Sequence, residues 1–482
     1  MPASSFYMIR TARRASQIPK FLSLSRTMTT TAPIIPQDRH GHLPSSQSPI
    51  TTKMHFFNSV MESGKQIPTY RVLDGVGNPI DGAEVPELDK ALAVRLYEIM
   101  VLLPTLDNIL YNVQRQGKIS FYMTTHGEEA TVVGSAAALA PNDEVLGQYR
   151  EMGVLLWRGF TLNSVMAQCF GNEEDKATKG RQMPVVSDFG KKNPTLRRSC
   201  PQSLLFQNEI ISQHFGSTEH HFHTISSPLA TQIPQAAGVG YALKRDPERR
   251  GKNCAVVYFG EGAASEGDFH AGMLLASTIP SPTLFLARNN GFAISTPSTE
   301  QYHGDGIAAR GPGYGIDTIR VDGNDVLAVL GAVREARKRC IESGRAVLVE
   351  AMTYRVGHHS TSDDSFAYRA RAEVEERKKV DNPIVRFRGF LESRGWWTTE
   401  EEEGLKTRLK TDALHAFKRA DGLKRHELKE LFSDVYGGPE PWNISEQRNE
   451  LSELLRKYGQ VWEPWRKELD KFKGKGEELS GK

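Results

Sequence analysis

Residues 254–291, CAVVYFGEGAASEGDFHAGMLLASTIPSPTLFLARNNG, decide the fold that this sequence predicts. The apolar runs Cys254 to Phe259 and Thr283 to Ala287 have the length of buried strands, and a helical segment at about Phe269 to Thr278 separates them. A strand, a helix and a second strand of these lengths predict one right-handed crossover unit of a parallel sheet.

The same alternation continues outward from this stretch. A helix at about Val326 to Ser343 and a strand at Ala346 to Met352 follow it. Before it, Glu87 to Asn112 has apolar residues at helical spacing and predicts a long amphipathic helix interrupted at Pro104. Glu128 to Leu139 is rich in Ala and Val and opens with an acidic pair suited to a helix N-terminus. The fold class is therefore α/β, a parallel sheet flanked by helices.

The composition excludes several classes of protein. Of the 482 residues, 39% are hydrophobic and 25% are charged, as in soluble globular proteins. The formal charge of +3 is too balanced for nucleic acid or an anionic membrane surface as the main partner. No apolar run approaches the ~20 residues that span a bilayer, so we expect no membrane insertion. The four cysteines have no C-x-x-C spacing, which argues against a zinc site or a disulfide framework.

The N-terminus has the composition of a targeting segment. Residues 1–37 carry five Arg or Lys residues, many Ser and Thr residues, and no acid before Asp38. We interpret them as a mitochondrial transit peptide that directs the chain to the matrix; a disordered basic tail is the alternative. Residues 38–69 then form a linker and N-terminal extension, residues 70–382 the α/β domain, and residues 383–482 a helical C-terminal region.

Two loops at predicted strand ends carry the candidate chemistry. One strand ends in the loop Gly260 to Asp268, whose small residues let backbone amides approach a phosphate. The next strand ends in Arg288-Asn-Asn-Gly291. Ligands collect at the carboxyl ends of parallel strands, so we expect Glu261 and Asn290 to meet there. A carboxylate, an amide oxygen and diphosphate oxygens predict a magnesium site.

These two loops together resemble the thiamine diphosphate motif, which opens with Gly-Asp-Gly and closes one crossover unit later with Asn-Asn. Here Glu261 stands in place of the Asp. The resemblance implies a thiamine diphosphate-binding fold, of which this chain is the diphosphate-binding half. The implied cofactor contacts are Gly260, Glu261, Gly262, Ala263 and Asn290, and the implied magnesium ligands are Glu261, Asn290 and Phe292.

Further segments resemble the alpha subunits of the heterotetrameric 2-oxo acid dehydrogenases. The similarity runs, with one gap, from about Tyr70 to Tyr436. The segments that carry it are Phe121-Tyr122-Met123, Gly147-Gln148-Tyr149-Arg150-Glu151, Gly180-Arg181-Gln182-Met183-Pro184 and Ser226-Ser227-Pro228-Leu229-Ala230-Thr231-Gln232.

This resemblance implies roles for individual residues. Tyr149, Arg150 and Arg288 would hold the cofactor diphosphate, and guanidinium groups suit that role because they match phosphate oxygens. The Ser-Ser-Pro-Leu-Ala-Thr-Gln loop would line the cofactor and bind a potassium ion; taken alone, it would pass for the capped start of a helix. Its cofactor contacts would be Ser227 and Leu229, and its potassium ligands Ser226, Pro228, Thr231 and Gln232.

Two segments indicate the substrate class within the family. Gly260 to Asp268 and Arg355 to Ser365 resemble the members that act on branched-chain 2-oxo acids. Members specific for pyruvate tend to carry Asp at the Glu261 position and a different loop after the histidine. The resemblance therefore implies decarboxylation of branched-chain 2-oxo acids in amino acid catabolism, and a pyruvate dehydrogenase alpha subunit is the alternative.

The loop His358-His359-Ser360 follows the last predicted strand. A histidine titrates near neutrality and can donate to a phosphate or an oxyanion. The resemblance makes His359 the catalytic residue and a cofactor contact, whereas we expect His358 to be structural. Ser360 matches the serine that a dedicated kinase phosphorylates in animal members, and the added charge would repel a diphosphate. The second phosphorylation position of the family falls on Ala370.

The resemblance also implies partners. The acyl group would pass to a lipoyl group of the core acyltransferase, and a regulatory kinase and phosphatase would act on the chain. The glutamate that activates the cofactor resides on a separate beta subunit in this family, so we expect an α₂β₂ heterotetramer and an inactive isolated chain. A transketolase-like single-chain enzyme would need a second catalytic half, and a non-catalytic scaffold would not need intact Glu261, Asn290, Arg150 and His359.

One segment departs from the family pattern. Members pass almost directly from Gly-Arg-Gln-Met-Pro-Val to a short His-rich segment, whereas here Val186 to Gln213 intervenes. Its removal would join Val185 to His214 and restore the pattern, and codons for its end residues can match splice-site consensus sequences. We therefore predict a translated retained intron. The alternative is a genuine surface loop, since long insertions cost little loop entropy; sequencing the transcript across Val185 and His214 distinguishes the two.

Overall fold

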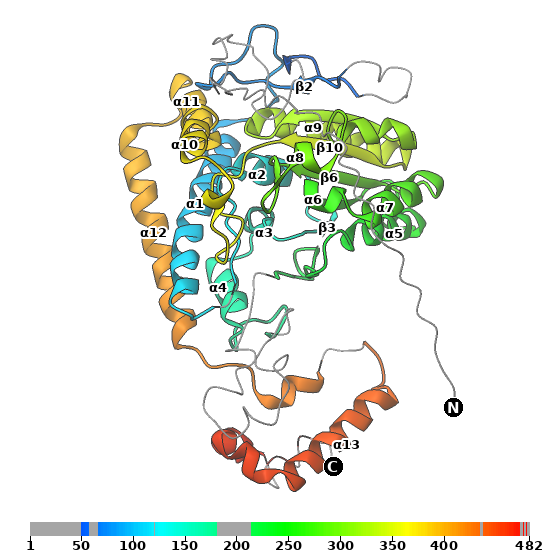
Figure 1. Cartoon of the computed structure of the whole chain (residues 1–482), viewed down its shortest axis with the longest axis vertical. Helices are drawn as coiled ribbons and strands as arrows, with labels where there is room; N and C mark the ends of the chain where they lie inside the picture. The colour runs from blue at the N-terminus through cyan, green and yellow to red at the C-terminus, as the bar shows by residue number, and fades with distance from the viewer. Residues whose placement is uncertain are drawn as a thin grey trace, which may run out of the picture. The chain divides into compact units, whose positions relative to one another are not determined.

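The fold is built on an eight-stranded sheet in which every neighbouring pair of strands is parallel (Figure 1). The computed structural model describes residues 50–56, 66–119, 121–180, 214–433, 437–472, 476 and 479. Across the sheet the strands run in the order β1-β2-β9-β10-β6-β5-β3-β4. Their bounds are β1 (Ile50–Thr51), β2 (Thr69–Tyr70), β3 (Glu144–Leu146), β4 (Phe222–His223), β5 (Ala255–Gly260), β6 (Thr283–Asn289), β9 (Asp317–Asp322) and β10 (Val347–Met352), and a small antiparallel hairpin pairs β7 (Phe292–Ala293) with β8 (Thr296–Pro297).

Alternate residues of the central strands face opposite layers of helices. In β5, Val256 and Tyr258 belong to one hydrophobic core, while Val257 and Phe259 belong to another. Parallel strands are buried on both faces, which is why they read as continuous apolar runs in the sequence. The predicted α/β class is therefore confirmed.

Each core is completed by its own set of helices. Figure 1 shows α5 (Gln232–Arg245) and α7 (Gly267–Thr278) side by side, and they pack together over the second core. The helices of the first layer are α1 (Lys90–Arg115), α2 (Glu129–Ala138), α3 (Met152–Trp157), α4 (Leu162–Phe170) and α9 (Val326–Ser343), and those of the second are α5 (Gln232–Arg245), α6 (Glu261–Ala264) and α7 (Gly267–Thr278).

Helix α1 continues through Pro104, so the predicted interruption at that residue is wrong. Proline removes one backbone donor from a helix and is unfavourable there. Buried side chains lie on both sides of it, among them Met100, Leu103, Leu106 and Leu110. Tertiary packing of this apolar face outweighs the local penalty, as it does for most helices in folded proteins.

Strand β9 was not predicted, although it lies inside the sheet between β2 and β10. Its sequence, DTIRVD, interrupts the apolar pattern with charged residues that the fold buries. Arg320 forms an ion pair with Glu350 at 2.9 Å, and Asp322 forms one with Arg386 at 2.7 Å. Buried charges are tolerated when they are paired, and these partners are distant in the sequence.

The C-terminal part of the chain is helical. Helices α11 (Pro383–Ser393) and α12 (Thr399–Gly422) pack against α1, and Thr398 and Glu401 form a capping box at the start of α12. Among the residues described, no helix is both long and apolar enough to cross a membrane. The remaining elements are α8 (Ser298–Gln301), η4 (Ala308–Arg310), η5 (Pro312–Tyr314), η6 (Ser365–Ala367), α10 (Arg371–Val380), η7 (Leu428–Phe432), α13 (Trp442–Lys457), η8 (Gly459–Trp465) and α14 (Arg466–Leu469).

Two predicted segments lie outside the described residues. These are the transit peptide, residues 1–37, and the insert Val186 to Gln213. Both stay predictions, as do the domain boundaries at residues 70 and 383.

Candidate active site

Five parallel strands deliver their carboxyl ends to one cavity of about 250 Å³. The segments that follow β3, β4, β5, β6 and β10 line it. Every residue predicted to contact the cofactor is in its wall: Tyr149, Arg150, Ser227, Leu229, Gly260, Glu261, Gly262, Ala263, Arg288, Asn290 and His359. The wall also includes Phe292, a predicted magnesium ligand, and Arg355, for which no role was predicted.

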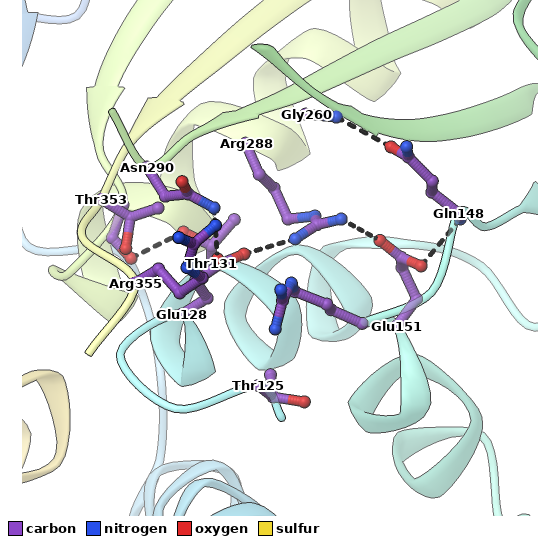
Figure 2. Close-up of polar contacts among 12 residues, drawn as sticks. Thr125, Glu128, Thr131, Gln148, Glu151, Gly260, Arg288, Asn290, Thr353 and Arg355 are labelled. Atoms are coloured by element: carbon purple, nitrogen blue, oxygen red, sulfur yellow. Dashed lines mark hydrogen bonds and ion pairs between the residues drawn. The ribbon is translucent and has the colours of Figure 1, made fainter. Parts of the chain in front are cut away.

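Arg288 is held between two buried carboxylates, as Figure 2 shows. Its guanidinium forms ion pairs with Glu128, directly before α2, and with Glu151, directly before α3, the latter at 2.6 Å. Burial by itself would lower the pKa of Arg288, but Glu151 and Glu128 raise it above its ordinary value. Arg288 is therefore charged and fixed at the end of β6.

Arg150 lines the cavity, and no carboxylate among the described residues is hydrogen-bonded to it. Its guanidinium donates to the backbone oxygens of Thr124 and His359, the latter at 2.7 Å. Burial lowers the pKa of Arg150 to about 10, a value at which the side chain is still charged at neutral pH. A buried cation bonded only to neutral oxygens favours an anion nearby.

Arg355 has the same character. It donates to the backbone oxygens of Phe292 at 3.3 Å and Ile294 at 2.7 Å, and to the hydroxyl of Tyr368 at 2.9 Å. Arg355 and Arg150 thus give one wall of the cavity a positive charge that the described side chains bonded to them do not neutralise.

Glu261 is a buried carboxylate with one oxygen that has no hydrogen-bond partner among the described residues. That atom is Oε1, while Oε2 accepts from the backbone nitrogen of Asn290 at 3.3 Å. Burial raises the pKa of Glu261 to about 7. A buried oxygen without a donor costs free energy unless something binds it, so this position suits a cation.

The amide of Asn290 is bonded at both ends. Its nitrogen donates to Glu128 at 2.8 Å, and its oxygen accepts from the backbone nitrogen of Phe292 at 3.2 Å. Glu261 and Asn290, which the sequence places one crossover unit apart, therefore do meet at adjacent strand ends, as predicted.

The predicted potassium ligands form only a partial cluster. The hydroxyl of Thr231 lies 3.3 Å from the hydroxyl of Ser226 and 3.3 Å from the backbone oxygen of Pro228. The fourth predicted ligand, Gln232, is buried and donates its amide nitrogen to the backbone oxygen of Tyr258 at 3.1 Å. The structure thus brings three of the four oxygen-bearing residues together and directs the amide nitrogen of the fourth to β5.

Tyr149 joins the same loop to the cavity wall. Its hydroxyl donates to the backbone oxygen of Ser227 at 2.7 Å. The Ser227 hydroxyl lies 2.8 Å from Nε2 of His214, and burial lowers the pKa of His214 to about 4. The loop is thereby fixed to the turn that follows β3.

The two histidines of the last loop have different surroundings. Nδ1 of His358 accepts from the backbone nitrogen of Ser365 at 3.0 Å, a contact of the kind expected of a structural histidine. His359 lines the cavity, and burial together with Arg150 and Arg355 lowers its pKa to about 3. Ser360 is buried, and its hydroxyl oxygen accepts from the backbone nitrogen of Ser362 at 3.3 Å.

The sequence did not reveal the roles of Glu128, Glu151 and Arg355. The acidic pair Glu128 and Glu129 suits a helix N-terminus, but the side chain of Glu128 makes no capping hydrogen bond and pairs with Arg288 instead. One signal was available: an acid directly before a helix as apolar as α2 is drawn into the interior with it, and a buried acid requires a cationic partner.

The chain is similar to known proteins over most of its length. The family model described as dehydrogenase E1 component matches residues 97–204 and 206–429. The chain is 49% identical over 423 residues to the human protein named 2-oxoisovalerate dehydrogenase subunit alpha, mitochondrial, covering 88% of this chain and 87% of the relative. It is 47% identical to alpha subunit 1 from Arabidopsis thaliana over 87% of this chain and 82% of the relative. The namesake from Caenorhabditis elegans is 46% identical over 86% of this chain and 89% of the relative.

Proposed function

The chain belongs to the dehydrogenase E1 component family, and from this premise we propose that it is the alpha subunit of an enzyme that oxidatively decarboxylates branched-chain 2-oxo acids. The activity is that of a 3-methyl-2-oxobutanoate dehydrogenase with a lipoyl group as acceptor. Near-half identity along almost the whole chain to subunits named for 2-oxoisovalerate carries the substrate class and does not favour pyruvate.

The cofactor we propose for the cavity is thiamine diphosphate, which when bound supplies the electron sink for decarboxylation. The residues present fit its diphosphate. Within the part of the chain that the structure describes, Arg150 and Arg355 are bonded only to neutral groups, and Arg288 adds a third cation. Gly262 packs closely against Ala293, because a Cβ there would lie 3.0 Å from the Cβ of Ala293 and would require that neighbour to shift.

We further propose magnesium at Glu261, Asn290 and Phe292. The orphaned Oε1 of Glu261 is the observation that supports it, and carboxylate, amide and carbonyl oxygens are the donors that this cation prefers. The potassium proposal rests on Ser226, Pro228 and Thr231, whose oxygens lie close together, with Gln232 as the fourth candidate.

We propose His359 as the residue that donates a proton or a hydrogen bond in the cavity. Arginine can only donate, so Nδ1 of His359, which lies 3.3 Å from Nη1 of Arg355, must be the accepting nitrogen. The ring proton then resides on Nε2. That N–H is available to a phosphate oxygen or to an oxyanion formed from the substrate.

Assembly with a beta subunit follows from the family, and we propose an α₂β₂ heterotetramer that delivers acyl groups to the lipoyl-bearing core acyltransferase. The relatives are named mitochondrial, and we propose the matrix as the location. Regulation by a kinase and phosphatase at Ser360 is also proposed. Because Ser360 is buried, the loop would have to open before a kinase could reach it.

The experiment is decarboxylation with an artificial electron acceptor, using this chain coexpressed with its beta subunit, with and without thiamine diphosphate. We expect cofactor-dependent turnover of branched-chain 2-oxo acids well above that of pyruvate, and none from the isolated chain. A preference for pyruvate would overturn the substrate class, and full activity of the isolated chain would overturn the heterotetramer. If the assembled enzyme were inactive, deletion of residues 186–213 would show whether the insert is responsible.

A further inference from the structure

Glu128 is bonded to both side chains through which the end of β6 reaches the cavity. One carboxylate oxygen pairs with Arg288, and the other accepts from the amide nitrogen of Asn290 at 2.8 Å (Figure 2). Glu128 is fully buried and does not line the cavity among the described residues. Any effect of Glu128 on a ligand in the cavity therefore passes through Arg288 and Asn290.

The bond to Asn290 decides which end of the amide faces which way. An asparagine amide has an accepting oxygen and a donating nitrogen of nearly equal size. A carboxylate only accepts, so the nitrogen must face Glu128, and the oxygen turns towards the backbone nitrogen of Phe292 at 3.2 Å. The Asn290 oxygen, rather than its NH₂ group, is thereby left for a cation beside Glu261.

Glu128 is suited to this task because the ion pair with Arg288 holds its carboxylate in place beside Asn290. If the amide turned over, its oxygen would face a carboxylate oxygen, and neither atom could donate a hydrogen bond.

We propose that Glu128 is a positioning residue that orients Asn290 for magnesium and Arg288 for the cofactor diphosphate. The inference deepens the proposed function and rests on it. Partners that orient metal ligands from outside the coordination shell commonly change metal affinity by about 10- to 100-fold when they are mutated.

Glu151 provides a matched comparison. It pairs with Arg288 at 2.6 Å and accepts from the backbone nitrogen of Gln148 at 2.8 Å, but it has no bond to Asn290 in the structure. Loss of Glu151 should disturb only the arginine, whereas loss of Glu128 should disturb both the arginine and the amide.

The test uses the chain assembled with its beta subunit and follows thiamine diphosphate binding by quenching of tryptophan fluorescence. The magnesium concentration for half-maximal binding is measured at saturating cofactor. For Glu128→Gln we expect this concentration to rise about 10- to 100-fold, because a glutamine can present its own NH₂ to Asn290 and allow the amide to turn. For Glu151→Gln we expect weaker cofactor binding with the magnesium requirement unchanged.

A rescue separates orientation from general damage. In the double variant Glu128→Gln, Asn290→Asp, the glutamine nitrogen can donate to the aspartate, whose second oxygen accepts whichever way the group turns. We expect most of the lost magnesium affinity to return. Glu129→Gln is the fold control: Glu129 is buried but bonded only to the backbone nitrogen of Gly127 among the described contacts, and burial raises its pKa to about 8, so glutamine resembles its protonated form.

The outcomes distinguish the inference from its premise. If the wild-type complex does not bind thiamine diphosphate with magnesium, the proposed function is wrong. If it binds and Glu128→Gln shows an unchanged magnesium requirement, the positioning role is wrong. An equal magnesium defect in Glu151→Gln would place the effect on Arg288 and refute the orientation of Asn290. If Glu128→Gln alone fails to assemble, as judged by its thermal unfolding, the double variant carries the test, and a failure to bind magnesium there refutes the inference.

Discussion

Nδ1 of His359 lies 3.3 Å from Nη1 of Arg355, and the backbone oxygen of the same histidine accepts from Arg150 at 2.7 Å. The histidine is thus held between two cations. Burial, Arg150 and Arg355 lower its pKa to about 3, so the imidazole is neutral at every physiological pH. An anionic ligand between these arginines would relieve their effect on the histidine and make its protonation easier.

The neutral state of His359 predicts a loss of stability in acid. The unfolded chain takes up this proton near pH 6.5, whereas the folded chain resists it until about pH 3, so stability falls as the pH falls below 6.5, by up to about 1.4 kcal/mol per pH unit. Between pH 7 and 5, the melting temperature of the cofactor-free complex should fall less for His359→Gln than for the wild type. The exposed His415 serves as control, and a wild-type pH dependence in His359→Gln would contradict the prediction.

The same substitution should separate catalysis from cofactor binding. A positioned acid or base contributes about 10²- to 10⁴-fold to a rate, so kcat of His359→Gln should fall by at least about 100-fold. Glutamine can still donate one hydrogen bond, so the thiamine diphosphate concentration for half-maximal binding should change far less. Titration of the cofactor by fluorescence, beside steady-state kinetics, measures both. A defect confined to cofactor affinity would leave His359 a binding residue only.

Because both faces of the sheet are buried, Phe285→Ala should strongly lower the free energy of unfolding. Phe285 lies on β6, is fully buried and belongs to the core shared with α5 and α7. Truncation of a buried phenylalanine costs about 3–5 kcal/mol, because it loses apolar burial and leaves a cavity. Leu274→Ala on α7 is the control, since Leu274 is 53% exposed and its loss should cost no more than about 0.5 kcal/mol. Chemical unfolding of the assembled complex at one protein concentration measures the difference, and equal costs would refute the layer assignment.

The strands that the sequence predicted are those with several apolar residues in succession. β5 carries no charged residue, and β6 and β10 each carry one, Arg288 and Glu350, whereas β9 alternates apolar residues with Arg320 and Asp322. Their partners, Glu350 and Arg386, are distant along the chain, so no local sequence pattern indicates that these charges are buried. β3 and β4, at three and two residues, are too short to show any period.

The site shows the same division. Gly260 to Ala263, Arg288 and Asn290 could be placed at one sheet edge because parallel strands end together. The two carboxylates that pair with Arg288 could not be predicted from the sequence. Glu128 and Glu151 lie directly before helices that only the tertiary fold brings close to Arg288. A short sequence motif contains the residues that contact a ligand. The acidic residues that position those residues lie at no fixed distance from the motif along the chain.

If the oxygen atoms of the loop after β4 bind potassium, this ion should stabilise the complex against heat. The hydroxyl of Thr231 lies between Ser226 and Pro228, and Thr231→Val removes that oxygen while keeping the shape of the side chain. The potassium concentration that half-maximally stabilises the complex against heat should rise about tenfold, equivalent to about 1.4 kcal/mol for one lost ligand. Thr278→Val, whose hydroxyl bonds to the backbone oxygen of Leu274 within α7, is the matched control. An identical response in both variants would remove Thr231 from the site.

We expect substitution of Arg150 to cause a large loss of cofactor affinity. Its hydrogen bonds to described residues all go to carbonyl oxygens, so Arg150→Met removes a charge that none of these partners offsets. A hydrogen bond to a charged group contributes about 1.5–3 kcal/mol, which corresponds to about 10- to 100-fold in the dissociation constant for thiamine diphosphate. Arg408→Met, which breaks an exposed pair with Glu98, should leave that constant unchanged.

The chemical origin of the loss can be tested with a shorter ligand. If Arg150 acts on the diphosphate, Arg150→Met should weaken thiamine diphosphate much more than thiamine, because thiamine lacks the group that the guanidinium would bind. Competition between the two ligands on the wild-type and variant complexes measures the ratio directly. An equal loss for both ligands would mean that Arg150 supports the cavity through Thr124 and His359 and does not recognise phosphate.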